Sequence, residues 1–283
     1  MPDILKNLRS IIAVYICITL FHSCNIINPT EKIPTYLHVD SFQFVGAASH
    51  EISTVIAYYN NSPIGTFDLP ATIPILAEGN GNVQLFPGIV SNGQNDRMLT
   101  YIFYKPDVYA LTAQPGTVVN YIPKTRYDSA VKFYTISDFE FGQIKMSKAA
   151  GNVSITAVTD PALVFDGSGT GSILLTAAGD SSVDSSNIAF PIKNGAAFIE
   201  FDYKTQIPFA VGIQAELAGL YTVDPYYLAG LNPTDKWRKF YLNVSGYITQ
   251  YNATAYRFYL RTSLPANLTN GRLLIDNIKL VTF

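Results

Sequence analysis

The sequence has 283 residues, enough for one large domain or two modest ones. Charged residues make up 14% of it, against about 25% in an average globular protein, while 19 tyrosines and 17 phenylalanines make it rich in aromatic residues. Near-average glycine and proline exclude a collagen-like or a disordered chain. The net charge of −2, without a basic block, excludes a nucleic-acid binder held by counterion release. Three histidines and two cysteines leave little for metal–thiolate or redox chemistry.

Residues 1–23 have the pattern of a signal peptide. Two basic residues precede an uncharged apolar run, residues 11–21, which is too short to cross a bilayer as a helix and suits a signal-peptide core. Residues 21–24 (FHSC) follow and resemble the lipobox of bacterial lipoproteins, in the relaxed form found in the Bacteroidetes. The resemblance implies cleavage before Cys24 and lipidation of that cysteine. A secreted protein cut elsewhere and an uncleaved anchor are the alternatives.

A lipidated Cys24 implies a protein anchored in the bacterial outer membrane. Residues 24–35 would then form a short tether between the membrane and the fold. Residues 25–28 (NIIN) lack the acidic cluster of many surface-exported Bacteroidetes lipoproteins, so the choice between the periplasmic side and the cell surface stays open. Cys17 lies in the removed segment, so the mature chain would have no disulfide and must be stabilised by its core.

Residues 36–125 are predicted to form a small β-sandwich. Apolar residues alternate with polar or aromatic ones from Tyr36 to Asp40, which is typical of a half-buried strand. Two strand-like runs, 52–59 and 64–69, are joined by Asn-Asn-Ser-Pro, which favours a hairpin. This stretch resembles immunoglobulin-like or carboxypeptidase-regulatory-like domains of Bacteroidetes surface lipoproteins. The resemblance lies in the order of the strands, the Gly-Thr-Phe and Leu-Pro-Ala segments and the glycine-rich turn.

Residues 126–135 are predicted to be a linker or a shared edge strand, and residues 136–283 to form a second β domain. Its predicted strands are short and separated by turn signals, a pattern typical of a sandwich or a jelly roll. Residues 138–140 (DFE), 237–244 (WRKFYLNV) and 273–280 (LLIDNIKL) resemble the jelly rolls of carbohydrate-binding modules of the galactose-binding-like type. The sequence therefore predicts an all-β protein, a small sandwich followed by a jelly-roll sandwich.

Few residues suit catalysis. The glycine-rich segment 167–171 lacks the Gly-Lys-Ser/Thr of a phosphate-binding loop and leads into a strand, so we interpret it as a strand connection. His38 and His50 form no zinc-binding pattern. Glu200 and Asp202 share a strand face and could serve glycoside hydrolysis, but the same spacing is equally that of a solvated face. A carboxylate-based glycoside hydrolase is therefore ranked behind two non-catalytic functions.

The two non-catalytic functions are glycan or ligand binding by a surface module, and a structural or adhesion role with protein partners. The jelly-roll resemblance implies glycan binding, in which pyranose rings stack on exposed aromatic side chains. Tyr221, Tyr226 and Tyr227 lie in a loop-like segment, and Trp237 begins the strand that follows. These four are the candidate ligand-binding residues. The alternative is that they pack, since aromatic side chains bury large areas in sandwiches.

The same resemblance implies a structural Ca²⁺ ion that ties the first strand of the jelly roll to the last. Glu140 and Asp276 stand at the positions of its acidic ligands. Ca²⁺ takes about six to eight oxygen ligands, so backbone carbonyls would complete the site. The alternative is that Glu140 is solvated and that Asp276 starts a turn or pairs with a lysine or arginine.

Overall fold

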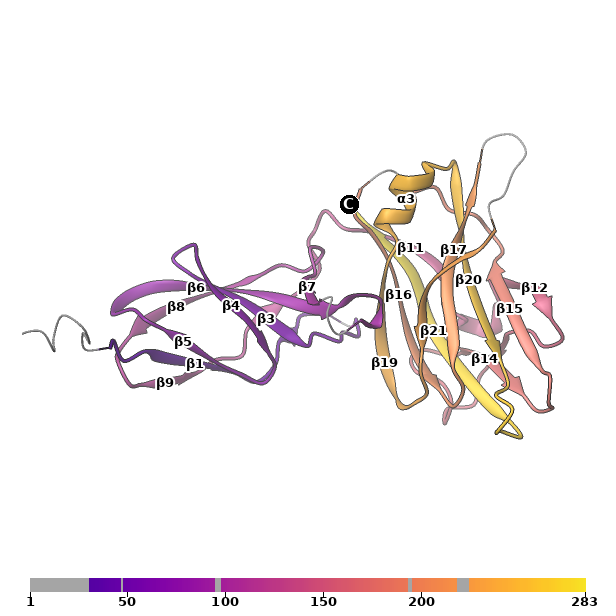
Figure 1. The fold of residues 1–283 in the computed structure, drawn as a ribbon, viewed down its shortest axis with the longest axis horizontal. Coiled ribbons are helices and arrows are strands. Elements are labelled where there is room, and N and C mark those ends of the chain that lie inside the picture. Colours follow the sequence, from indigo (N-terminus) through magenta and orange to yellow (C-terminus); the bar gives the residue numbers. More distant parts are fainter. Residues whose placement is uncertain (1–30, 47, 95–97, 193–194, 218–223) are drawn as a thin grey trace, which may run out of the picture.

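The computed structural model describes residues 31–46, 48–94, 98–192, 195–217 and 224–283. These residues form two β-sandwiches that follow one another along the long axis of the molecule (Figure 1). The fold is all β, as predicted, and the described residues contain one α-helix, α3 (Ser245–Tyr251). Within the same residues, no helix has the length and hydropathy needed to span a bilayer.

The N-terminal sandwich packs a three-stranded sheet against a five-stranded one. The three-stranded sheet has the order β5 (Ala71–Ile75), β1 (Thr35–Val39) and β9 (Val118–Asn120). The five-stranded sheet contains β4 (Ser62–Asp68), β3 (Thr54–Tyr59), β6 (Gly79–Val90), β7 (Met98–Thr100) and β8 (Asp107–Ala113), and β7 and β8 both pair with β6. A separate parallel pair consists of β2 (Gln43–Phe44) and β10 (Lys124–Thr125).

Local sequence explains two features of this sandwich. Asn60 and Asn61, which connect β3 to β4, both have positive φ (46° and 67°), as a tight type I′ hairpin requires and as asparagine tolerates. On β1, Leu37 and Val39 are fully buried and their neighbours are not, which confirms the predicted period of two. The predicted hairpin is therefore present, and β1 contributes to the core.

The C-terminal sandwich consists of a six-stranded and a five-stranded antiparallel sheet. The six-stranded sheet has the order β13 (Thr156–Val158), β14 (Thr170–Leu175), β21 (Gly271–Thr282), β16 (Ala197–Thr205) and β19 (Thr234–Asn243), and β11 (Lys132–Ser137) also pairs with β21. The five-stranded sheet has the order β12 (Met146–Gly151), β15 (Ser181–Ser186), β20 (Ala255–Ser263), β17 (Phe209–Glu216) and β18 (Tyr226–Leu231). Single 3₁₀ turns lie at Ser91–Gly93 and Glu140–Gly142.

Residues 132–135, at the end of the predicted linker, belong to the edge strand β11.

The apolar interior of the C-terminal sandwich lies between its two sheets. Ile199 and Phe201 on β16 are fully buried there, together with apolar residues from the facing strands of the other sheet. Because side chains alternate along a strand, the residues between them in sequence point away from this core. We call the surface on which they lie the outer face of the six-stranded sheet.

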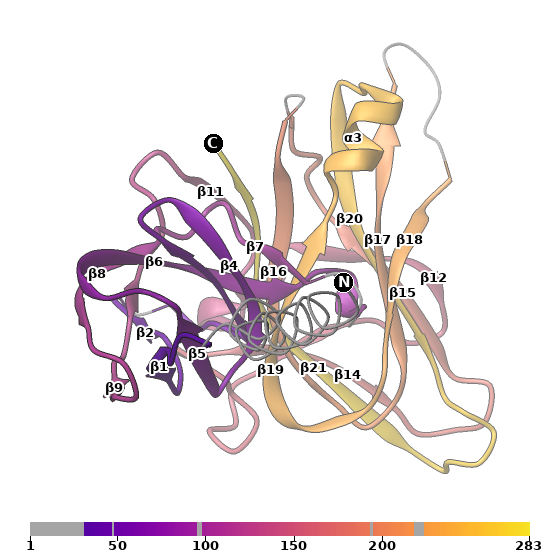
Figure 2. The same cartoon turned by 60° about the vertical axis from the view of Figure 1, so that its left-hand side comes forward.

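The N-terminal sandwich is docked on one half of this outer face (Figures 1 and 2), and we call the contact the joint. Its buried apolar and aromatic residues are Ile89, Tyr101, Phe103 and Tyr104 from the N-terminal sandwich and Phe198, Tyr241 and Val281 from the outer face. The Tyr101 ring makes edge-on contacts with Phe198 and Tyr241, with ring centroids 5.1 and 4.9 Å apart. Such aromatic pairs stabilise a contact beyond the area that they bury.

The joint also encloses charged groups, which are paired. The Glu200 carboxylate is 0% exposed, and its Oε2 lies 3.1 Å from Lys239 Nζ and 3.5 Å from Lys279 Nζ. The hydroxyls of Tyr101 and Tyr127 donate to its two oxygens at 2.5 and 2.6 Å. Burial opposes ionisation of Glu200, but the two lysines and the two hydroxyls together hold its pKa below the ordinary value. The interpretation of Glu200 as part of a solvated face is wrong.

Further hydrogen bonds connect the two sandwiches across the joint. Asp202, also buried, accepts hydrogen bonds from Ser49 Oγ at 2.8 and 2.9 Å, and Ser49 Oγ in turn accepts one from Lys239 Nζ at 3.2 Å. Burial raises the pKa of Asp202. The Glu51 N–H donates to the Tyr241 hydroxyl at 3.0 Å. Polar and aromatic contacts therefore join the two sandwiches over the covered half of the outer face.

Candidate functional site

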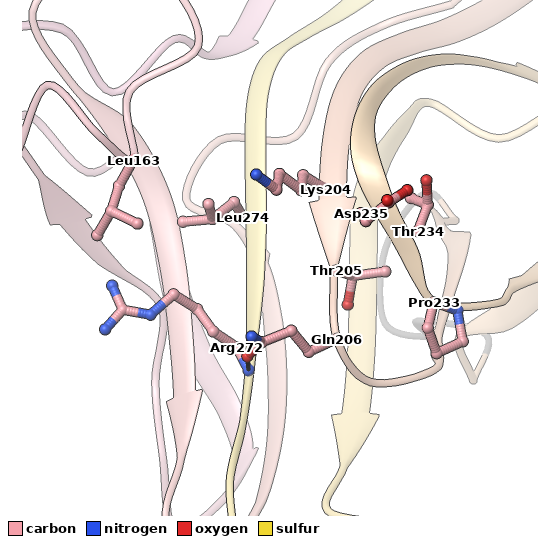
Figure 3. Close-up of a pocket in the computed structure, with 9 residues that line it drawn as sticks. All are labelled: Leu163, Lys204, Thr205, Gln206, Pro233, Thr234, Asp235, Arg272 and Leu274. Carbon is pink, nitrogen blue, oxygen red and sulfur yellow. Dashed lines mark hydrogen bonds between the residues drawn. The ribbon is translucent and has the colours of Figure 1, made fainter.

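The other half of the outer face carries an open groove of about 760 Å³ (Figure 3). Residues of β16 and β21 line it, together with the turn that leads into β19 and Leu163 from the segment between β13 and β14. Every described residue that lines the groove belongs to the C-terminal sandwich.

Strand register places two long cationic side chains side by side in the groove. Lys204 on β16 pairs with Leu274 on β21, and Arg272 lies two residues before Leu274 on the same face. Diagonal neighbours of this kind are about 7–8 Å apart, within reach of long side chains. Gln206 forms two hydrogen bonds with the first residues of β21. Its side-chain oxygen accepts the backbone N–H of Arg272 at 3.0 Å, and its backbone N–H donates to the Arg272 carbonyl at 2.9 Å. The guanidinium of Arg272 extends towards Leu163 (Figure 3).

Three charged side chains line the groove without a partner. Lys204 Nζ, the Arg272 guanidinium and the Asp235 carboxylate make no hydrogen bond or ion pair with any residue that the structure describes. Leu163 and Leu274 add apolar surface beside them. Apolar walls with a few unpaired polar groups are the usual composition of a small-ligand site.

Trp237, one of the predicted binding residues, lies next to this groove. It is half-buried and stands two residues before Lys239 on β19, so both point away from the core. Its ring packs against Phe165, with ring centroids 4.8 Å apart. The structure thus places Trp237 on the outer face of the six-stranded sheet.

The predicted tyrosines lie on the other sheet. Tyr226 and Tyr227 begin β18, an edge strand of the five-stranded sheet. The Arg261 guanidinium lies over the Tyr227 ring, 4.1 Å from its centroid, and the Tyr226 ring stacks on Tyr247 with centroids 5.8 Å apart. Tyr221 lies outside the described residues. The structure therefore gives Tyr226 and Tyr227 different partners on the five-stranded sheet and places Trp237 on the opposite side of the sandwich.

The predicted metal ligands lie on either side of the loop that precedes β14. The N–H and hydroxyl of Ser168 donate to Glu140 Oε2 at 2.9 and 2.6 Å, and the Thr170 hydroxyl donates to Asp276 Oδ2 at 2.7 Å. Burial, and in lesser part the charges of Asp202 and Glu140, raise the pKa of Asp276 to about 7. Neither carboxylate forms an ion pair with a described residue, and these residues include no group of three or more His, Cys, Asp or Glu that could hold a metal. A Ca²⁺ ion here would need most of its ligands from backbone oxygens.

A second pocket, of about 430 Å³, lies where the joint meets the loop around Phe165. Its carboxylates are Asp166 and Asp202. Asp202 is bonded to Ser49, and Asp166 accepts the N–H of Gly167 at 2.8 Å. Because its polar groups already bond to the protein, this pocket is less suited to a ligand than the groove.

The groove residues Lys204, Gln206, Asp235 and Arg272 were not identified from the sequence. Alternation along the two strands could have placed Lys204 and Arg272 on outward positions. Lys204 and Arg272 become neighbours through the register between β16 and β21. The two strands are far apart in the chain, so no local pattern predicts that register.

Comparisons with known proteins give a likeness of fold. No protein-family model and no curated protein matches the sequence. The chain is similar to the family 11 carbohydrate-binding module of a Clostridium thermocellum cellulosomal cellulase, at 14% identity over 54% of this chain and 95% of that one, with a TM-score of 0.39. It is also similar to a family 30 carbohydrate-binding module from the same organism, at 10% identity over 53% of this chain and 96% of that one, with a TM-score of 0.42.

A third similar structure is the enzymatically active domain of tailspike protein 4 from bacteriophage CBA120. The identity is 12% over 52% of this chain, with a TM-score of 0.42, and the match covers 21% of the tailspike chain. All three likenesses concern about half of this chain.

Proposed function

We propose that this protein is a non-catalytic glycan-binding module of the bacterial cell envelope. The observation that supports binding best is the groove on the open half of the outer face. Leu163, which is partly exposed, offers apolar surface for the C–H face of a sugar ring. Lys204, Arg272 and Asp235 offer unpaired polar groups for its substituents. A few placed polar groups beside apolar walls fix the orientation of a small ligand and give specificity.

The charges of the groove favour binding without cleavage. Among the described residues, Asp235 is the one carboxylate that lines it. Glycoside hydrolysis uses two carboxyl groups, about 5–5.5 Å apart in retaining and about 6.5–9.5 Å apart in inverting enzymes. Glu200 and Asp202, the pair considered from the sequence, are buried at the joint and bonded there to Lys239 and Ser49. A substrate in the groove would therefore meet one acid.

A glycan array with residues 25–283 tests this function. We expect binding to a defined class of polysaccharide, which is recovered uncleaved. Leu163→Ala removes apolar surface from the groove and should weaken binding several-fold. Leu76→Ala is the matched control, because Leu76 is exposed just after β5 in the N-terminal sandwich and does not line the groove.

Three outcomes would contradict the proposal or relocate the site. Absence of binding to every glycan on the array would refute glycan binding and favour the alternative of protein contacts. Release of reducing ends from a bound polysaccharide would refute the non-catalytic assignment. Loss of binding in Tyr227→Ala but not in Leu163→Ala would move the site to the five-stranded sheet.

We also propose that the protein is a lipoprotein of the bacterial outer membrane, anchored at Cys24. This proposal rests on the sequence, because Cys24 lies outside the described residues. The first described residues lie at the end of the N-terminal sandwich that is farthest from the C-terminal sandwich (Figure 1). An anchor at that end would leave the groove far from the membrane, with the N-terminal sandwich as a spacer.

Replacement of the two cysteines tests the anchor. Cys24→Ala should accumulate as an uncleaved precursor and lose labelling by a palmitate analogue, because stable anchoring needs the acyl chains attached there. Cys17→Ala is the control and should be labelled as the wild type is. Normal labelling of the Cys24 variant would refute the anchor.

We propose, further, that a structural Ca²⁺ ion is held by Glu140 and Asp276. Support comes from the buried Asp276 carboxylate, which has no cationic partner in the described part of the chain. A buried charge without a countercharge is costly, and Ca²⁺ would supply one. EDTA should lower the Tm of residues 25–283, and excess CaCl₂ should restore it, because a ligand bound to the native state stabilises it. Asp276→Asn should abolish this response, and an unchanged wild-type Tm in EDTA would refute the ion.

A further inference from the structure

The groove carries two positive charges on one side. Lys204 and Arg272 face the same space from neighbouring strands, and Figure 3 shows the Lys204 ammonium near Leu274 and the Arg272 guanidinium near Leu163. Like charges on neighbouring positions of a sheet repel one another. At the joint, on the same outer face, the comparable residues Lys239 and Lys279 both form ion pairs with Glu200. Among the described residues, no acid forms such pairs with Lys204 or Arg272.

The acid that the groove does contain does not neutralise these cations. Asp235 forms no ion pair with Lys204 or Arg272, or with any other described residue. The groove therefore has a local excess of positive charge in a chain whose net charge is −2. An anionic group that entered it would meet two cations free of competing bonds.

We propose that the groove binds a uronic acid residue of an acidic polysaccharide, with its carboxylate between Lys204 and Arg272. This inference rests on the proposed glycan-binding function and names the class of glycan. The planar guanidinium of Arg272 can bond both oxygens of a carboxylate, and Lys204 adds a second charge. The groove volume of about 760 Å³ lies within the range of ligand sites, about 300–1,000 Å³.

The remaining side chains of the groove fit the rest of a sugar. Leu163 gives apolar contact for a ring face. The amide nitrogen of Gln206 is a free donor for a hydroxyl, because its oxygen is the atom bonded to the Arg272 N–H. The Asp235 carboxylate accepts hydrogen bonds from hydroxyls and repels a carboxylate, which directs the acid group of the ligand towards the cationic side.

Titration calorimetry with two forms of one polymer tests the inference. Polygalacturonate and its methyl ester share a backbone and differ in charge. Residues 25–283 should bind the acid at least about tenfold more tightly than the ester, and an increase in NaCl from about 50 to about 300 mM should weaken binding of the acid alone. Arg272→Ala and Lys204→Ala should each lose at least about fivefold in affinity for the acid and little for the ester.

Two further variants sharpen the test. Arg272→Lys keeps the charge but not the fork of donors, so its affinity for the acid should fall between those of the wild type and Arg272→Ala. Lys148→Ala removes the same charge from an exposed position on β12, in the other sheet, and should bind as the wild type does. An equal loss in Lys148→Ala would show a general charge effect and overturn the assignment to the groove.

Other outcomes separate the failure of this inference from the failure of the function. Equal affinity for the acid and the ester, or unaltered binding by Arg272→Ala and Lys204→Ala, overturns the acidic ligand but leaves glycan binding intact. Absence of binding to both polymers and to every arrayed glycan overturns the function as well. Tighter binding of dextran sulfate, which carries sulfate groups and no carboxylate, than of polygalacturonate, lost in Arg272→Ala, replaces the carboxylate by a sulfate group and overturns the uronic acid.

Discussion

Both halves of the outer face of the six-stranded sheet carry charged residues. Those at the joint are buried and paired, whereas those in the groove are partly exposed and unpaired among the described residues. At the joint, Glu200 and Lys239 are almost completely buried and lie 3.1 Å apart. In the groove, Lys204 and Arg272 are partly exposed and have no ionic partner in the described residues. Charges removed from water are tolerated only when they are paired, whereas charges that keep water contact can stay free. Pairing and burial therefore separate structural charges from those available to a ligand.

The buried carboxylates of the joint also take hydrogen bonds from the N-terminal side of the molecule. Tyr101 and Tyr127 from the N-terminal side complete the hydrogen bonds of Glu200, and Ser49 does the same for Asp202. Without them, Glu200 would keep the two lysines Lys239 and Lys279 but lose two hydrogen bonds, and Asp202 would lose those from Ser49. The covered half thus depends on the N-terminal sandwich, and the open half does not.

The largest expected effect is that of removing Glu200. Glu200→Ala leaves Lys239 and Lys279 facing each other in the joint without a countercharge. Loss of one partner of a buried ion pair costs about 3–5 kcal/mol, and urea denaturation should show a loss of this size in the free energy of unfolding. The control is Glu216→Ala, which breaks the partly exposed pair with Arg257 and should cost less than about 1 kcal/mol. Equal losses in the two variants would contradict the distinction between buried and exposed charges.

A smaller loss is expected when one hydroxyl is removed from the joint. Tyr101→Phe keeps the ring contacts but deletes the hydrogen bond to Glu200, and a hydrogen bond to a charged group contributes about 1.5–3 kcal/mol. Tyr109→Phe serves as the control, because the Tyr109 hydroxyl forms no hydrogen bond with a described residue and its ring stacks on Tyr121. Urea denaturation of both variants measures the difference. If Tyr109→Phe lost as much free energy of unfolding as Tyr101→Phe, the hydrogen bond of the Tyr101 hydroxyl would not be the cause of the loss.

The charge of Glu200 should also affect how the free energy of unfolding depends on pH in the acidic range. Its pKa is lowered in the folded protein, so its contribution is fully present above the unfolded value of 4.5 and is lost as the pH falls through the folded pKa. The stability difference between wild type and Glu200→Gln should therefore shrink as the pH falls from about 6 to about 3. Glu78→Gln, at an exposed loop position, should show no such trend. A difference that stays constant over this range would refute a lowered pKa.

The smallest expected effect on stability is that of the groove charges. Arg272→Ala and Lys204→Ala remove no protein contact of the charged groups, so each should change the free energy of unfolding by less than about 0.5 kcal/mol. Thermal and urea unfolding test this alongside the binding experiments. A destabilisation above about 1 kcal/mol would show that these side chains support the fold, and the contrast between groove and joint would fail.

Much of the fold was predictable because it depends on local patterns. Alternation of buried and exposed residues identified β1, and the two asparagines after β3 identified the hairpin to β4. The same rules placed Glu200 and Asp202 on one face of β16 but could not tell that another sandwich covers that face. Trp237 and Tyr227 are close in the sequence, yet they lie on different sheets, because β18 and β19 belong to opposite layers of the sandwich.

The sequence by itself determined that the protein is all β and which side chains alternate between core and surface. These properties follow from the two-residue period of a strand and from turn residues, which act over a few neighbours. Tertiary structure alone decided the register of β16 against β21, the docking of the N-terminal sandwich and hence which charges are buried. The reason is physical: burial and pairing depend on residues that are distant in the chain, so one lysine of the outer face becomes part of the joint and another is left open to a ligand.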